Sequence, residues 1–322
     1  MYRFAALAIA VALCSVGSVA RADHYSYQSI SNPYNPRDTH LTGINDLGVI
    51  VGEDAGSGVE ESFLLSSGKY SPISNPLGDS TFAEGINNAG AIVGFSRSIL
   101  SVVDSGFVLV GGNYTPIIDP YGRDGTDAIG INNLGEVVGQ YNSSADRTGE
   151  SPNGFLFSDG VYTDIDVPSA TGTSARGIND LGQIVGVFGP RSEGFLLSGG
   201  VYSVISAPYA NAIIDSISIN DAGLIVGTYI VGGGAHTFVY ENGVFTTLDP
   251  FGSSQNVAND VNNLGQIVGS YNTDTSAEGF LATPNLTPTP EPATWAMLAL
   301  GAGALGATLR RRRGAALARI AT

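Results

Sequence analysis

One ten-residue motif occurs six times in the chain, and this repeat constrains the fold more than any other feature. The first copy is GINDLGVIVG at Gly43, the last is DVNNLGQIVG at Asp260, and successive copies start 41 to 47 residues apart. A period of this length is typical of propeller blades rather than of coiled-coil heptads or short solenoid turns. The other copies are GINNAGAIVG, GINNLGEVVG, GINDLGQIVG and SINDAGLIVG, starting at Gly85, Gly130, Gly177 and Ser218.

Each repeat predicts four short strands. The motif itself reads as a hairpin, in which the segment ending in GI is followed by the turn NDLG or NNLG and then by a strand beginning IVG. A second hairpin follows, for example GFLLSGGVYSVISAP from Gly194, where a Gly-containing turn joins two β-rich runs. Six repeats of four antiparallel strands, named A to D here, predict an all-β, six-bladed β-propeller.

The ends of the repeat region predict how the ring closes. The sixth repeat supplies strands A, B and C, the last of which is GFLATP from Gly279, and contains no D strand. The segment YSYQSISNP from Tyr25 matches the D-strand segment KYSPISNP from Lys69. We therefore expect this N-terminal strand to pair with the strand that contains Phe280, which removes the open sheet edges.

The first 22 residues read as a secretory signal peptide. Arg3 precedes an apolar run from Phe4 to Leu13, and an A-x-A pattern ends at Ala22. A short membrane anchor is the alternative, although the run is shorter than a bilayer requires. The propeller is predicted to occupy residues 23–284, and Cys14, the single cysteine, precedes it.

The C-terminal region predicts a membrane-spanning segment. A Pro/Thr linker at 285–292 precedes an uncharged helix at 293–309 and a basic tail at 310–322, which places the arginines on the cytoplasmic side. This tail resembles the PEP-CTERM sorting signal of Gram-negative bacteria, except that GAALARIAT extends beyond the arginines. The residues that carry the resemblance are Pro290, Glu291, Pro292, Arg310, Arg311, Arg312 and Arg313.

The PEP-CTERM resemblance implies a processing partner and a destination. The partner is an exosortase that cleaves near the P-E-P triplet after transient anchoring in the inner membrane. The destination is the cell surface or the extracellular space, often in a setting of exopolysaccharide and biofilm. An ordinary C-terminal tail anchor is the alternative. The repeats, over roughly residues 25–284, also resemble HAF-type extracellular repeats, which implies location and architecture only.

The charge of the body limits its partners. Residues 23–289 contain seven basic and 28 acidic residues, a formal balance of −21. Such a surface repels nucleic acid and anionic lipid, which require basic patches. Cations and basic partners are electrostatically favoured.

Strand alternation predicts where ligands bind. The A-to-B and C-to-D turns are short and lie on one face, whereas the B-to-C and D-to-A loops vary in length and lie on the other, where binding is expected. Acidic loops are compatible with Ca²⁺, but no loop has the D-x-D-x-D-G spacing, so solvated carboxylates are preferred and no cofactor is predicted. The candidate ligand-face residues are Asp54, Glu61, Asp124, Asp127, Tyr141 and Asp274.

The aromatic residues divide into two sets. One Phe recurs in each C strand, at a position that predicts core packing between blades. Aromatic residues outside the repeat pattern are the better candidates for glycan contact. They are Tyr121, Tyr141, Tyr209, Tyr229 and Phe251.

No catalytic residue is predicted. The body has three histidines and lacks cysteine, G-x-S-x-G and H-E-x-x-H. The sequence therefore favours a non-catalytic, exported propeller that binds a polysaccharide or a protein partner. The alternative is a carboxylate-dependent polysaccharide lyase or hydrolase.

The repeated motif itself is interpreted as a turn rather than a cation loop. The position of Asp46 is Asn in three copies, whereas the preceding Asn and the later Gly occur in all six. Both residue types accept positive φ in tight turns. We accordingly expect binding on the opposite face.

Overall fold

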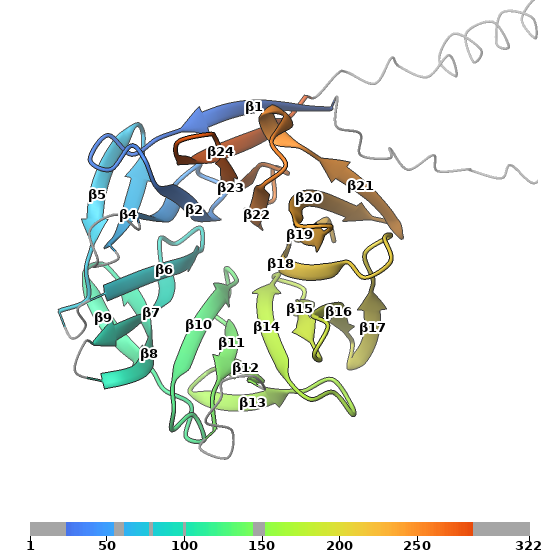
Figure 1. Ribbon diagram of the computed structural model, residues 1–322. Coiled ribbons are helices and arrows are strands. Elements are labelled where there is room, and N and C mark those ends of the chain that lie inside the picture. The colour runs from blue at the N-terminus through green and yellow to red at the C-terminus, as the bar shows by residue number, and fades with distance from the viewer. Residues whose placement is uncertain (1–23, 55–60, 77–79, 99–100, 144–151, 286–322) are drawn as a thin grey trace, which may run out of the picture. The chain divides into compact units, whose positions relative to one another are not determined.

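A computed structural model describes residues 24–54, 61–76, 80–98, 101–143 and 152–285. Within these residues the chain forms six four-stranded antiparallel sheets around a central axis, as Figure 1 shows. The predicted six-bladed β-propeller is confirmed. In blades 1 to 5 the strands follow chain order, and in blade 6 the N-terminal strand supplies the fourth.

The strands of the first three blades are short. Blade 1 contains β2 (Thr39–Ile44), β3 (Ile50–Asp54), β4 (Glu61–Ser66) and β5 (Lys69–Ile73). Blade 2 contains β6 (Ser80–Ile86), β7 (Ile92–Ser98), β8 (Ser101–Val110) and β9 (Asn113–Ile117). Blade 3 contains β10 (Thr126–Ile131), β11 (Val137–Tyr141), β12 (Asn153–Ser158) and β13 (Val161–Ile165).

The other three blades have the same organisation. Blade 4 contains β14 (Thr173–Ile178), β15 (Ile184–Phe188), β16 (Glu193–Ser198) and β17 (Val201–Ile205). Blade 5 contains β18 (Ile213–Ile219), β19 (Ile225–Val231), β20 (Gly234–Glu241) and β21 (Val244–Leu248), and the 3-10 segment η2 (Pro250–Gly252) follows it. Blade 6 contains β22 (Asn256–Val261), β23 (Ile267–Asn272), β24 (Ala277–Pro284) and β1 (Tyr25–Ile30).

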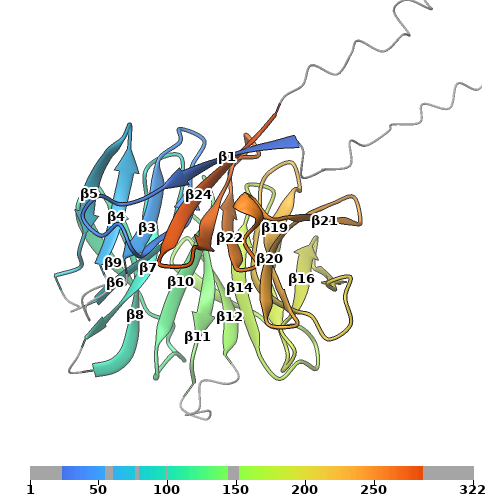
Figure 2. The same ribbon diagram turned by 45° about the horizontal axis from the view of Figure 1, so that its top comes forward.

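The ring closes through β1 and β24, as the sequence predicted. The two strands pair antiparallel, with Tyr25 opposite Pro284 and Ser29 opposite Phe280. Figure 2 shows them side by side at the rim of the propeller. The pairing with β1 covers the edge of β24. An uncovered edge could pair with a strand of another chain.

A layer of phenylalanines packs the blades together. Phe155 of β12 is fully buried and lies opposite Gly139 of β11. A Cβ atom on Gly139 would lie 1.9 Å from the main-chain oxygen of Asp127 in the bulged strand β10, and 2.9 Å from the Phe155 ring. Only glycine fits this position. The equivalent phenylalanines, all buried as predicted, are Phe63, Phe107, Phe195, Phe238 and Phe280.

Threonines fix the D-to-A connections between blades. The hydroxyl of Thr39 accepts a hydrogen bond from the main-chain nitrogen of Asn32 at 3.0 Å, and Thr126 does the same for Asp119 at 3.0 Å. These bonds satisfy buried main-chain donors where the chain leaves one blade and enters the next. The loops on this face therefore start from rigid positions.

The predicted signal peptide, linker, transmembrane helix and basic tail lie outside the described residues. Across the part of the chain that the structure does describe, no helix has the length and apolar character needed to cross a bilayer.

Candidate functional site

The motif asparagines join the blades on the A-to-B face. The side-chain oxygen of Asn45 accepts hydrogen bonds from the main-chain nitrogens of Leu47 (3.1 Å) and Val49 (3.0 Å), and its amide nitrogen donates to the main-chain oxygen of Asn87 at 3.0 Å. The same contacts recur from blade to blade. Asn262 completes the circle by donating to the main-chain oxygen of Asn45 at 3.0 Å.

This ring corrects one prediction from the sequence. The motif glycines do adopt positive φ, as Gly48 does at 73°, but the motif asparagines do not. Asn occurs in every copy because its amide bonds its own turn and the next blade at once. A side chain without both a donor and an acceptor could not form all of these hydrogen bonds.

A second ring lies beside the first, one residue further along each motif. The main-chain nitrogen of Asp46 donates to Oδ1 of Asn88 at 2.8 Å, and the circle closes where Asn263 donates to Oδ1 of Asp46 at 2.7 Å. Asparagine amides also donate to the second carboxylate oxygens, as Asn263 does to Oδ2 of Asp221 at 2.7 Å. The aspartates are thus bonded to protein donors. No group of three or more metal-ligating side chains occurs among the described residues.

The central channel encloses about 500 Å³ and is lined mainly by the innermost strands. Glu84 of β6 and Arg176 of β14 belong to its wall. Removal from water raises the pKa of Glu84 to about 7, although the positive charge of Arg176 acts in the opposite direction. Nε of Arg176 is buried, and no described residue forms a hydrogen bond with it. The channel therefore contains a carboxyl group that changes its charge near neutral pH.

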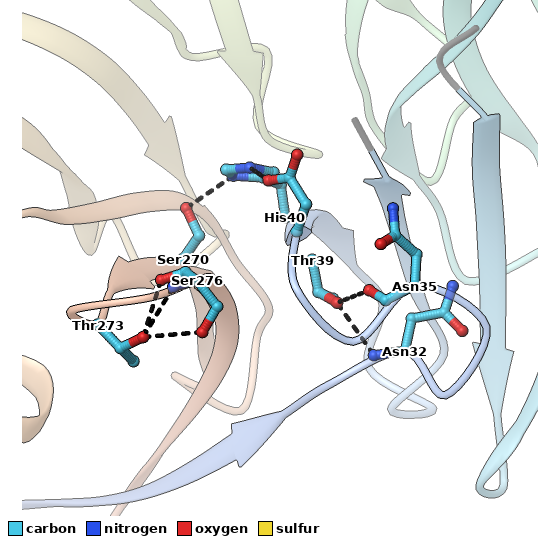
Figure 3. Close-up of polar contacts among 8 residues, drawn as sticks. Asn32, Asn35, Thr39, His40, Ser270, Thr273 and Ser276 are labelled. Atoms are coloured by element: carbon cyan, nitrogen blue, oxygen red, sulfur yellow. Dashed lines mark hydrogen bonds and ion pairs between the residues drawn. The ribbon is translucent and has the colours of Figure 1, made fainter. Parts of the chain in front are cut away.

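A chain of three polar side chains crosses the closure between blades 6 and 1, and two of them, His40 and Ser270, line the channel (Figure 3). Nδ1 of His40 lies 3.1 Å from Oγ of Ser270, and its Nε2 lies 2.8 Å from Oδ1 of Asp38. The residue types match those of a nucleophilic triad. Ser270, however, is only 4% exposed. Its burial favours a structural role in joining the two blades.

The acidic candidates predicted from the sequence do not form one cluster. Asp54 and Glu61 lie opposite each other on β3 and β4 of blade 1. Burial raises the pKa of Asp54 to about 6, and Nδ2 of Asn32 donates to it. Asp124 and Asp274 are exposed in loops of blades 3 and 6.

Two other candidates are buried in blade 3. Burial raises the pKa of Asp127 to about 6, and its Oδ2 accepts a hydrogen bond from Gln140 at 2.9 Å. Tyr141 is 6% exposed and donates to Oδ1 of Asp164 at 3.1 Å. Tyr141 and the likewise buried Tyr229 therefore offer no ring face for a ligand, contrary to expectation.

Exposed aromatic rings recur on the face that carries the D-to-A connections. In four of these six connections a proline is followed by Tyr or Phe, whose exposure ranges from 49% to 83%. Two of the rings rest on buried tyrosines: Phe251 stacks on Tyr271 with centroids 4.5 Å apart, and Tyr209 contacts Tyr229 at 5.3 Å. We call this surface the aromatic face; its four residues are Tyr34, Tyr121, Tyr209 and Phe251.

The sequence analysis named three of these four residues and missed Tyr34. The signal was available, because NPY, DPY, APY and DPF each follow a predicted D strand. Tyr34 lies in the connection between the N-terminal closing strand and blade 1. Aligning the D-to-A loops with one another would have identified it.

Comparisons with known proteins support export and the fold. Residues 288–313 match the PEP-CTERM protein-sorting motif. The chain therefore carries the signal of an exported, surface-directed exosortase substrate. No curated protein sequence matches the chain.

Solved structures show the same architecture at low sequence identity. A streptogramin B lyase is 11% identical, with a TM-score of 0.52 over 82% of this chain and 99% of that one. A gluconolactonase from Xanthomonas campestris is 13% identical, with a TM-score of 0.51 over 82% of this chain and 92% of that one. At such identities the likeness concerns the fold alone. The resemblance of the repeats to HAF-type repeats stays a prediction.

Proposed function

We propose that this exported propeller binds a neutral polysaccharide through its aromatic face and performs no catalysis. The observation that carries the proposal is the recurrence of Tyr34, Tyr121, Tyr209 and Phe251 in one type of loop on one face. Exposed apolar side chains gathered on one face of a protein are typical of binding sites.

The rings suit a carbohydrate for two reasons. A sugar ring has an apolar C–H face that stacks on an aromatic plane, while its hydroxyl groups require polar neighbours. Exposed carboxylates supply such neighbours in the same loops, for example Asp124 after Tyr121 and Asp249 before Phe251. The four rings come from connections spread around the propeller, a spacing that suits an extended chain better than a single sugar.

Charge favours a neutral polymer. The body has a formal balance of −21, so an acidic polysaccharide would be repelled at low ionic strength. Delivery by the sorting motif to the cell surface is compatible with a ligand in an exopolysaccharide matrix. Surface and biofilm association are part of this proposal.

The second candidate function is a carboxylate-dependent polysaccharide lyase or hydrolase in the channel. The observation in its favour is Glu84, a channel residue whose pKa of about 7 suits a general acid at neutral pH. The Glu84→Gln substitution removes this group and leaves the aromatic face unchanged. It thus separates catalysis in the channel from binding at the loops.

A binding panel with residues 23–289 tests both candidates. The panel contains dextran, pullulan and amylose as neutral polymers, alginate as an acidic one and chitosan as a cationic one. We expect retardation in gels containing a neutral polymer, loss of retardation in Tyr34→Ala/Tyr121→Ala/Tyr209→Ala/Phe251→Ala, and no effect of Glu84→Gln. Reducing ends or unsaturated products that disappear in Glu84→Gln would instead support the enzyme.

A further inference from the structure

The face opposite the aromatic face carries a different set of exposed apolar residues. Four A-to-B turns each place a leucine at the tip, and these leucines are 61% to 74% exposed. Four C-to-D turns on the same face add exposed valines. We call this surface the aliphatic face; its residues are Leu47, Leu134, Leu181, Leu264, Val110, Val161, Val201 and Val244.

The turn geometry does not require these leucines. The corresponding residue is alanine in blades 2 and 5, at Ala89 and Ala222, and those turns make the same backbone contacts. The leucines recur in turns whose motifs are hydrogen-bonded from one blade to the next, so with the valines they gather apolar side chains on one face. Exposed apolar side chains gathered on one face indicate a contact surface.

Both ends of the propeller leave from the aliphatic face. Strand β24 is the third strand of blade 6, so it ends on the face of the A-to-B and C-to-D turns, and β1 begins there because it runs antiparallel to β24. Tyr25 and Pro284 are paired at this end. A Cβ atom on Gly265 would lie 3.1 Å from Cγ of Pro284, which places the exit beside the turn of Leu264.

The chain beyond Pro284 sets how far the propeller can move from a membrane. Eight residues, 285–292, separate the body from the apolar segment 293–309. Fully extended, they span at most about 28 Å. A linker of this length limits how far the end of β24 can lie from the apolar segment.

We propose that the aliphatic face rests on the lipid surface while the C-terminal segment anchors the unprocessed protein. The leucines enter the interfacial region of the bilayer, and the aromatic face points away from it. Processing of the tail then releases this contact. The inference concerns orientation and does not depend on the identity of the polysaccharide.

The acidic ring on this face does not oppose contact with neutral lipid. Oxygens of Asp46 and Asp221 accept hydrogen bonds from main-chain nitrogens and asparagine amides of neighbouring blades. Protein donors thus replace part of their hydration. A second copy docked face to face would bring two rings of carboxylates together, which like-charge repulsion disfavours.

Site-directed spin labels on the membrane-anchored chain test the proposal. Cys14 is the single cysteine, so a Cys14→Ser background accepts one label at a time. The labels replace Leu47, Leu134 and Leu181 on the aliphatic face, and Tyr121 and Tyr209 on the aromatic face. Full-length protein is reconstituted in phosphatidylcholine vesicles at low protein-to-lipid ratio, and accessibility to oxygen and to a water-soluble nickel chelate is measured.

The expected result is an oxygen-to-nickel accessibility ratio severalfold higher at all three leucine positions than at the two tyrosine positions. Equal ratios on the two faces would overturn the proposal. A high ratio at Leu47 alone would also overturn it, because the tether rather than the face would then make the contact. Dipolar broadening between labels on different molecules would assign the face to a second copy and would contradict the proposal.

A second variant separates lipid contact from folding. Leu47→Gln/Leu134→Gln/Leu181→Gln/Leu264→Gln changes exposed turn tips, so we expect its thermal midpoint to match that of the parent. In this variant a spin label replaces Ala89, whose turn contains none of the four Leu→Gln changes. The label therefore reports whether the face still contacts lipid without the leucines. Its oxygen-to-nickel ratio is expected to fall toward that at Tyr121; an unchanged ratio would contradict a role for the leucines.

Discussion

The side-chain amide of Asn262 donates a hydrogen bond to the main-chain oxygen of Asn45 at 3.0 Å and so joins the last blade to the first. The same side chain accepts from the main-chain nitrogens of Leu264 and Gln266 at 3.1 and 2.9 Å. One buried amide therefore satisfies three main-chain groups in two blades. The ring of such residues belongs to the scaffold that holds the loops of both faces.

Replacing Asn262 by alanine should destabilise the propeller strongly. The substitution removes the acceptor of two main-chain nitrogens and one of the two donors to the main-chain oxygen of Asn45, which keeps its bond from Gly48. These losses should lower the free energy of unfolding by about 2 to 4 kcal/mol. Urea unfolding of residues 23–289 measures the change. Ser203→Ala, at an exposed position on β17, is the control and should change it by less than about 0.5 kcal/mol. Equal effects of both substitutions would contradict a structural role for the ring.

Glycines with different surroundings should respond differently to substitution. In Gly139→Ala the new methyl group meets the main-chain oxygen of Asp127, so we expect a loss of about 3 kcal/mol or more. Gly182 has φ 70° and open space around it, so Gly182→Asn should cost less than about 1 kcal/mol. Thermal unfolding compares the two variants. A larger loss of stability in Gly182→Asn than in Gly139→Ala would contradict the view that close contact between strands requires glycine at position 139.

Stability should fall as pH rises from about 5 to 8. Burial raises the folded-state pKa of Asp54, Asp127 and Asp260 to about 6 and that of Glu84 to about 7, all above their ordinary values near 4. Between these values the folded state binds more protons than the unfolded state, so raising the pH favours unfolding. The melting temperature measured in steps from pH 5 to 8 should therefore decline.

The Glu84→Gln variant tests which group causes the upper part of this decline. The amide has no charge to desolvate, so the variant should lose less stability than the parent between pH 6 and 8. A parent melting temperature that rises over the same range would contradict the assignment of raised pKa values.

The sequence predicted the propeller because each blade repeats the same local signals. The match of the Tyr25 segment to the Lys69 segment was enough to predict that this strand would pair with the strand containing Phe280, as it does. The role of Asn45 was not predictable in this way, because its partner, Asn87, belongs to the next blade and spatial contact between blades is not written in one repeat.

The site was predicted less well than the fold. Tyr121, Tyr209 and Phe251 were named from their positions outside the repeat, and the structure places them on exposed loops. Tyr141 was named by the same reasoning and is buried, because its ring packs in the core with Phe155 while its hydroxyl is bonded to Asp164. The raised pKa of Glu84 depends on its place in the channel, which spacing along the chain does not reveal.

Hydrogen exchange with and without bound polysaccharide tests the central claim most directly. Residues 23–289 are incubated with the neutral glucan that retards them most, and exchange is followed for peptides covering both faces. We predict slower exchange in the D-to-A connections, at residues 31–38, 118–125, 206–212 and 249–255, and unchanged exchange in the A-to-B turns. Protection confined to the A-to-B turns, or none at all with every neutral polymer, would contradict binding at the aromatic face.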